Sequence, residues 1–233
     1  MRNALCCVGV CAVAGCLFGQ GSGIQGVISD EAGQLVAGAR VIASGVGPGG
    51  GRSYLALSGT SGQYSFTQVP VGNYAICVQG PRSGSSPVDQ SASPLVHYLD
   101  TCYWSGPTQA SVVAGQVGAN VNIRLVKGAA VHVRLNDPGQ YLARGQGVVL
   151  AGVVGSSSRF IPLAVTSSDP SGRTLELAIP LNAALRLQVH SGRLQLTDGS
   201  GAALPSIAAS FPIVQTAAQR DSLLTFNVVG KRP

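Results

Sequence analysis

Residues 61–78 read Ser-Gly-Gln-Tyr-Ser-Phe-Thr-Gln-Val-Pro-Val-Gly-Asn-Tyr-Ala-Ile-Cys-Val, and this stretch decides the fold. Tyr64 and Phe66 are separated by one polar residue, and the next apolar run, Tyr74-Ala-Ile-Cys-Val78, has the same spacing. Successive side chains of a β-strand point to opposite faces, so both runs predict strands with one buried face. Gly72 marks the turn between them.

The same alternation continues through the rest of the chain. Apolar residues occupy every second position in the runs Val121–Leu125, Val131–Leu135, Leu175–Ile179, Leu185–Val189 and Leu224–Val228. No window after residue 24 has the period of a helix, and Gly-containing turns separate the runs. Each strand therefore buries one face and exposes the other, which is typical of an antiparallel sandwich.

Composition limits the class of protein. The chain has 233 residues, of which 10% are charged and 45% apolar, and a formal net charge of +6. A coiled coil needs heptads rich in Glu and Lys, and a disordered chain has few apolar residues and a high net charge. Both classes are excluded, and the length allows one large domain or two small ones. The basic residues are dispersed, without a basic run, so no nucleic acid partner is expected.

After the first 23 residues, the same turns and strand patterns occur twice in the same order, at a separation of roughly 105–110 residues. Asp30-Glu-Ala-Gly-Gln34 is matched by Asp137-Pro-Gly-Gln140, and Ser61-Gly62 is matched by Ser171-Gly172. The repeat predicts two domains of similar layout, residues 23–127 and residues 128–233. Almost no linker separates them near Lys127-Gly128, so we expect a docked or stiffly hinged junction.

Three motifs in the first half carry a resemblance to a known family. They are Ile24-Gln-Gly-Val-Ile-Ser-Asp30, Gly33-Gln-Leu-Val-Ala-Gly-Ala-Arg-Val41 and Ser61–Tyr74, the last with Tyr-x-Phe and Pro-x-Gly-x-Tyr spacings. Together they resemble the carboxypeptidase regulatory-like domain, whose fold is a transthyretin-like β-sandwich. The second half shares only the order of landmarks.

The resemblance implies that Tyr64, Phe66 and Tyr74 fill a core between two sheets. Combined with the internal repeat, it implies an all-β protein made of two tandem Greek-key-type antiparallel β-sandwiches. A helical signal segment is expected before them.

The predicted export signal covers residues 1–22. Arg2 precedes an uncharged apolar run, residues 4–18, which is too short to span a membrane. Val13-Ala-Gly-Cys16 resembles a bacterial lipobox, in which Cys16 becomes lipidated, whereas Ala12-Val-Ala14 fits ordinary signal peptidase, and a third cleavage site near Gln20 also stays open. A lipid-anchored form and a free form both stay open. No second apolar run of spanning length follows, so no transmembrane helix is expected in the mature chain.

Four of the six cysteines lie in the signal, which leaves Cys77 and Cys102 in the body. Two cysteines in an oxidising compartment most simply form a disulfide. Because Tyr74, Ile76 and Val78 face inward, Cys77 must point to the outer face of its sheet. The bridge should therefore clip the loop before Cys102 over the outside of the first sandwich.

The segment 97–104, His-Tyr-Leu-Asp-Thr-Cys-Tyr-Trp, contains the only tryptophan. Its aromatic residues Tyr98, Tyr103 and Trp104 are the candidate ligand-binding residues, because exposed aromatic faces can stack on sugar rings. The competing interpretation, which we favour, is that Tyr103 and Trp104 pack the loop onto the sheet. In either case the disulfide should hold them near the outer side of the strand that carries Cys77.

Catalytic and metal-binding motifs are missing from the sequence. None of the three histidines (His97, His132 and His190) has a Glu within the following four residues, and neither HExxH nor G-x-S-x-G occurs. We expect no catalytic residue, no metal site and no cofactor. An isopeptide crosslink is disfavoured, because the only lysines, Lys127 and Lys231, lie at the ends of the two domains.

Together these observations predict an exported, non-catalytic β-sandwich protein of the bacterial envelope with a binding or scaffolding function. It would reside in the periplasm, in the outer envelope or outside the cell, and an envelope glycan or protein is the expected kind of partner. The first alternative is a carbohydrate-binding module that uses the aromatic loop 97–104. The second alternative, a small hydrolase, is disfavoured by the missing motifs.

Overall fold

The computed structural model describes most of the chain after residue 21. The described ranges are 22–47, 51–81, 96–114, 118–142, 149–155, 159–205, 209–215 and 221–233. Every regular element in these ranges is a β-strand, which confirms the all-β prediction. Within them, no helix is long and apolar enough to cross a membrane. The predicted signal segment, including Cys16, lies outside the described residues apart from Ser22.

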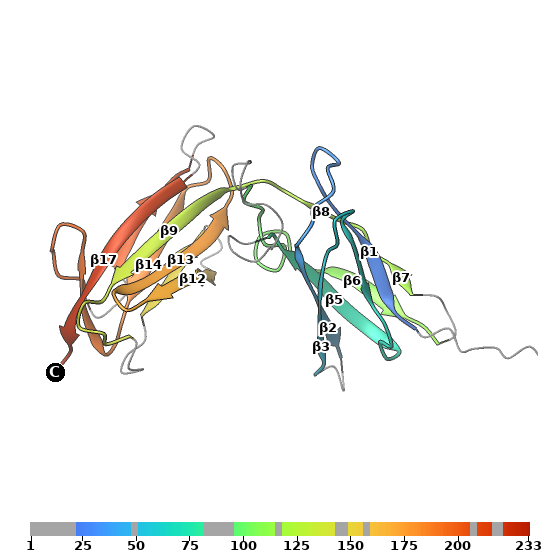
Figure 1. Cartoon of the computed structure of the whole chain (residues 1–233), viewed down its shortest axis with the longest axis horizontal. Coiled ribbons are helices and arrows are strands. Elements are labelled where there is room, and N and C mark those ends of the chain that lie inside the picture. Colours follow the sequence, from blue (N-terminus) through green and yellow to red (C-terminus); the bar gives the residue numbers. More distant parts are fainter. Residues whose placement is uncertain are drawn as a thin grey trace, which may run out of the picture.

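Two sheets pack face to face in the first sandwich (Figure 1). The strands are β1 (Ile24–Asp30), β2 (Arg40–Val46), β3 (Ser53–Leu57), β4 (Gln63–Phe66), β5 (Gly72–Gln79), β6 (Thr108–Val112), β7 (Ala119–Asn120) and β8 (Ile123–Leu125). One sheet has the order β4-β1-β7, with β8 also paired to β1, and the other has the order β3-β2-β5-β6. Tyr64, Phe66 and Tyr74 are buried in the core between them, as the resemblance implies.

The second sandwich has the same kind of architecture. Its strands are β9 (Ala129–Asn136), β10 (Leu150–Val154), β11 (Phe160–Pro162), β12 (Ala164–Asp169), β13 (Gly172–Ile179), β14 (Leu185–His190), β15 (Leu194–Asp198), β16 (Ala209–Ile213) and β17 (Asp221–Lys231). They form two sheets, of order β12-β13-β9-β17-β15 and β11-β10-β14-β16. Leu187 and Phe226 are among the largest fully buried side chains of this core.

Strand order shows that the internal repeat is structural. The order β13-β9-β17 corresponds to β4-β1-β8, and β11-β10-β14-β16 corresponds to β3-β2-β5-β6. The second sandwich adds β12 and β15 at the two edges of its larger sheet. One detail corrects the antiparallel prediction: β1 pairs in parallel with β7 and β8, and β9 pairs in parallel with β17. Parallel neighbours cannot be joined by a hairpin, so each closing strand reaches the first strand only after the chain has crossed the opposite sheet.

The acidic turns of the repeat have a common physical role. The carboxylate of Asp30 accepts hydrogen bonds from the backbone N–H groups of Ala32 and Gln34, at 2.9 and 2.8 Å. The carboxylate of Asp137 accepts bonds from the backbone N–H groups four and five residues later, at 3.0 and 2.6 Å. Both aspartates are buried. An Asp that binds its own following backbone stabilises a turn, and this explains why both halves carry one there.

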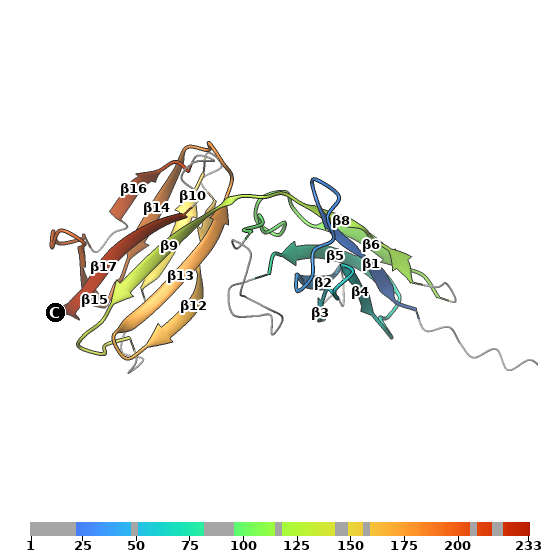
Figure 2. The ribbon, with the colours of Figure 1, turned by 45° about the horizontal axis from the view of Figure 1, so that its top comes forward.

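The two sandwiches lie beside each other and are joined by the short segment between β8 and β9 (Figures 1 and 2). Residues 96–105, called the wedge loop below, lie near this segment. Gly128 in the connection donates its backbone N–H to the carbonyl of His97 at 2.8 Å, and Leu99 donates to the carbonyl of Val126 at 2.9 Å. The junction therefore combines the connecting chain with a loop that belongs to the first sandwich.

Candidate functional site: the junction of the two sandwiches

The wedge loop is covalently attached to the first sandwich. Cys77 on β5 and Cys102 form a disulfide with Cα atoms 5.0 Å apart. The backbone N–H of Val78 also donates to the Thr101 hydroxyl at 2.7 Å. Ile76 and Val78 are fully buried while Cys77 is only half-buried, so the bridge lies on the outer face of the sheet, as strand parity predicts.

Asp100 holds the turn that leads into Cys102. It is buried, and its carboxylate accepts one hydrogen bond from the backbone N–H of Cys102 at 2.8 Å and another from the side-chain amide of Gln79 at 2.8 Å. Its carbonyl accepts a bond from the backbone N–H of Trp104 at 2.9 Å. A tight turn supported in this way fixes the direction of the two aromatic residues that follow.

Those two residues contact the second sandwich. The indole N–H of Trp104 donates to the carbonyl of Ala178 on β13 at 2.9 Å. Arg159 places its guanidinium carbon 5.8 Å from the ring centroid of Tyr103, within the range of a cation–π interaction. Both aromatic side chains are partly buried and pack against the core of the second sandwich.

This position corrects part of the sequence prediction. Tyr103 and Trp104 pack, as the favoured interpretation held, but the core that they pack against is that of the second sandwich. They bridge to the other domain. Alternation along a strand fixes which face Cys77 occupies, but it holds no information about which surface of a second domain is adjacent.

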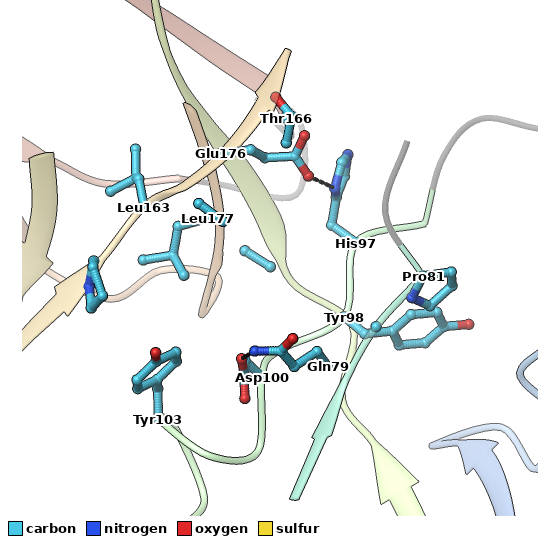
Figure 3. A pocket seen from close by; sticks show the side chains of 14 residues that line it. Gln79, Pro81, His97, Tyr98, Asp100, Tyr103, Leu163, Thr166, Glu176 and Leu177 are labelled. Carbon is cyan, nitrogen blue, oxygen red and sulfur yellow. Dashed lines mark hydrogen bonds and ion pairs between the residues drawn. The ribbon is translucent and has the colours of Figure 1, made fainter. Parts of the chain in front are cut away.

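Tyr98 points elsewhere. It pairs with Lys127 through an isolated β-bridge, and its ring packs against the core of the first sandwich. Figure 3 shows the ring directed away from the side chains of His97 and Glu176. Burial raises the pKa of Tyr98. The three candidate ligand-binding residues therefore do not converge on one exposed surface.

A carboxylate between two imidazoles lies at the same junction. His97 in the wedge loop has its Nδ1 atom 3.2 Å from Glu176 Oε1, and His132 on β9 has its Nδ1 atom 3.6 Å from Glu176 Oε2. Glu176 and His97 are largely shielded from solvent, with exposed side-chain fractions of 13% and 12%. Ring centroids of the two histidines are 6.0 Å apart. Among the described residues, no group of three or more His, Cys, Asp and Glu has an arrangement that could hold a metal ion.

The spacing of residues along the sequence predicts no site at His97 or His132, because no Glu follows either of them closely. Glu176 comes instead from β13, where it is the direct partner of His132 across the strand pair. One signal was available: His132 and Glu176 occupy polar positions of their alternating runs, and the chain has only two Glu residues.

His97 and Glu176 border a small cavity of about 150 Å³ between the sandwiches (Figure 3). The wedge loop contributes His97, Asp100 and Tyr103, and the second sandwich contributes Leu163, Thr166 and Glu176. The lining combines carboxylates, an imidazole and an aromatic ring. The cavity is smaller than the pockets that hold drug-sized ligands.

A second ion pair fixes the connecting chain. Lys127 Nζ lies 2.7 Å from Asp30 Oδ2, and the backbone N–H of Lys127 donates to Glu31 at 3.2 Å. The hydrogen bond with Lys127 lowers the pKa of Asp30, and the same bond raises the pKa of Lys127. An isopeptide bond needs a neutral amine and a protonated carboxyl, so these directions favour an ion pair over a covalent crosslink.

Comparison with known protein families gives a match for the first part of the chain. Residues 23–93 match the carboxypeptidase regulatory-like domain. This carboxypeptidase regulatory-like segment includes β1 to β5, and it provides Cys77, the anchor of the wedge loop. Among curated protein sequences, none matches the chain.

Several solved structures align with most of the chain at low sequence identity. The Bacillus anthracis TIE protein has 8% identity and a TM-score of 0.35, over 91% of this chain and 34% of that one. A streptococcal ancillary pilin has 14% identity and a TM-score of 0.37, over 92% and 63%. A shaft pilin from Lactobacillus rhamnosus GG has 11% identity and a TM-score of 0.33, over 89% and 98%. The chain spans about a third of the first of these proteins and under two thirds of the second.

Replacing Trp104 by Ala should weaken the junction rather than either core. The variant loses a half-buried ring and one hydrogen bond, so the free energy of unfolding should fall by about 1–2 kcal/mol. Chemical denaturation followed by circular dichroism measures this loss. Trp104→Phe, which keeps an aromatic ring but removes the N–H donor, should lose less. Equal stability of Trp104→Ala and wild type would contradict the role of Trp104 at the junction.

Proposed function

We propose that this chain is an exported, non-catalytic module of the cell envelope, in which two docked sandwiches serve binding or scaffolding. The observation that carries the proposal is the wedge loop, which is bonded covalently to one sandwich and seated on the other. Such a loop opposes relative motion of the two domains, and a stiff pair of domains suits a spacer or a presenting surface. The disulfide also fits an oxidising compartment outside the cytoplasm.

The domain assignment belongs to the same proposal. We place a signal peptide at residues 1–22, the carboxypeptidase regulatory-like sandwich at residues 23–127 and the second sandwich at residues 128–233. Gly128 at the start of the second domain supports this boundary: a Cβ atom there would lie only 2.6 Å from the carbonyl oxygen of Ile179. Any residue with a side chain at position 128 would force the connecting segment away from β13.

Expression of the full chain in a bacterial host tests export. The protein should fractionate with the envelope or the medium, with Cys77 and Cys102 oxidised, and mass spectrometry should find a mature amino terminus after removal of the signal. A diacylglyceryl group on Cys16 would establish the lipid anchor, and a terminus beyond Cys16 would establish the free form. An uncleaved protein in the cytoplasm with reduced cysteines would refute the proposal.

Carbohydrate binding is the second candidate function. The cavity beside Tyr103 supports it, because an aromatic ring next to carboxylates offers both stacking and hydrogen bonds to a sugar. Trp104 supports it less, since its indole N–H is already bonded to Ala178. Binding on a glycan array that is lost in Tyr103→Ala would favour this function, and no binding to any glycan would leave scaffolding. The hydrolase alternative gains no support from the described residues.

A further inference from the structure

We propose that His97 and Glu176 form an acid-strengthened clasp across the hinge between the two sandwiches. His97 belongs to the wedge loop and Glu176 to β13, and their nearest atoms are 3.2 Å apart (Figure 3). A neutral imidazole can donate a hydrogen bond to the carboxylate but carries no charge of its own. A protonated imidazole adds the attraction between opposite charges to that hydrogen bond. Histidine changes charge near pH 6.5, so mild acid should tighten the junction.

The position of the clasp explains how it would act on the hinge. The main chain passes from the first sandwich to the second at residues 126–128, and this segment is hydrogen bonded to the wedge loop through Leu99 and His97. The disulfide and Thr101 tie the same loop to β5. A bond from His97 to β13 therefore links a fixed part of the first sandwich directly to a sheet of the second.

His132 plays a different part. It is the direct partner of Glu176 across the β9–β13 pair, and both residues belong to the second sandwich. Its contact with Glu176 Oε2, at 3.6 Å, helps to orient the carboxylate but does not join the two domains. His97 is therefore the residue whose protonation changes the hinge.

Among the described cations of the junction, Arg159 lies over the Tyr103 ring, with its guanidinium carbon 5.8 Å from the ring centroid. The groups that face the clasp from neighbouring elements are an acid, a phenol, a hydroxyl and apolar side chains: Asp100 and Tyr103 from the wedge loop, Thr166 and Ala164 from β12, and Leu223 from β17. Arg134, two residues after His132, is bonded to Asp169 at 2.8 Å. Lys127 is bonded to Asp30 at 2.7 Å.

The expected pH profile has two limbs. A group that gains an anionic partner in the closed state holds its proton more tightly there, so acid favours the closed state. This effect should appear as the pH falls through about 6.5, where imidazole titrates. In stronger acid, protonation of the Glu176 carboxyl removes the attraction and the clasp opens.

Fluorescence of Trp104 provides the test, because it is the only tryptophan and lies in the same junction. Acrylamide, a neutral quencher, should reach the ring less easily when the clasp is closed. Between about pH 7.5 and 5.5 the quenching constant of the full chain should fall by up to about fivefold, as expected for a single ion pair.

Three variants separate the clasp from general effects of pH. His97→Gln and Glu176→Gln should each remove the pH dependence, while His190→Gln, which changes the histidine on β14 in the opposite sheet, should retain it. NMR titration of the His97 ring gives an independent readout: its midpoint should be lower in Glu176→Gln than in wild type. An unchanged quenching constant in wild type, or a pH response that persists in both glutamine variants at the junction, would overturn the proposal.

Discussion

Cys102→Ser should lower the free energy of unfolding of the first sandwich by about 2–4 kcal/mol, since the bridge closes a chain segment of 25 residues. The larger consequence concerns the junction. Thr101 and Asp100 would then hold the wedge loop by hydrogen bonds alone, and Trp104 would seat less firmly on β13. Limited proteolysis should cut the variant in the region of the wedge loop while both cores stay folded.

Two controls isolate the effect of the bond. Wild type in reductant should behave as Cys102→Ser does, and the double variant Cys77→Ser/Cys102→Ser should not respond to reductant. Denaturant unfolding with and without reductant measures the stability, and emission of Trp104 reports the state of the junction. Resistance of the reduced protein to protease, with unchanged emission, would show that the disulfide does not hold the loop.

Gly26→Ala should cost about 3 kcal/mol or more, because there is no space for a side chain at this position of β1. A Cβ atom on Gly26 would lie 1.9 Å from the carbonyl oxygen of Val121, in the segment between β7 and β8. That carbonyl also accepts the hydroxyl of Tyr64 at 2.8 Å. Burial raises the pKa of Tyr64 to about 12, so the hydroxyl keeps its proton at neutral pH and the bond persists. The substitution would displace the closing segment and break this bond.

Matched variants distinguish the clash from the lost bond. Tyr64→Phe removes only the hydroxyl and should cost about 1 kcal/mol. Gly51→Ala should be close to neutral, since nothing lies within 4 Å of a Cβ atom there. Thermal and denaturant unfolding of the three variants gives the comparison. If Gly26→Ala proves as stable as Gly51→Ala, the close approach of residue 121 to β1 is wrong.

The close approach at Gly26 gives a structural reason for one of the motifs that resemble the family. Gly26 belongs to the stretch Ile24–Asp30 that carries the family resemblance. A side chain is excluded at this position because the last segment of the sandwich lies directly against β1. The residues around position 26 cannot reveal that the side chain there is excluded by Val121, because Val121 lies 95 positions later in the chain. The partners are distant in sequence because the sandwich is closed by its first and last strands.

The local structure of this protein follows from its amino-acid sequence. Alternation of apolar and polar residues predicted the strands and the burial of Tyr64, Phe66 and Tyr74, because side-chain direction in a strand depends only on neighbouring backbone. The same local rule placed Cys77 on an outer face. The repeated landmarks predicted two halves of one layout, because each half carries the same turns in the same order.

The contacts between the two sandwiches, in contrast, are visible only in the folded structure. It brought Trp104 to Ala178 and His97 to Glu176, pairs that are separated by 74 and 79 positions along the chain. It also showed that the aromatic residues of the loop, which the favoured interpretation packs onto a sheet, pack against the core of the second sandwich. The physical reason is that these contacts depend on how two finished sandwiches dock, through a loop whose path is set by a disulfide and a short hinge. Side-chain periodicity specifies a face of a strand, but it does not specify the neighbour that covers that face.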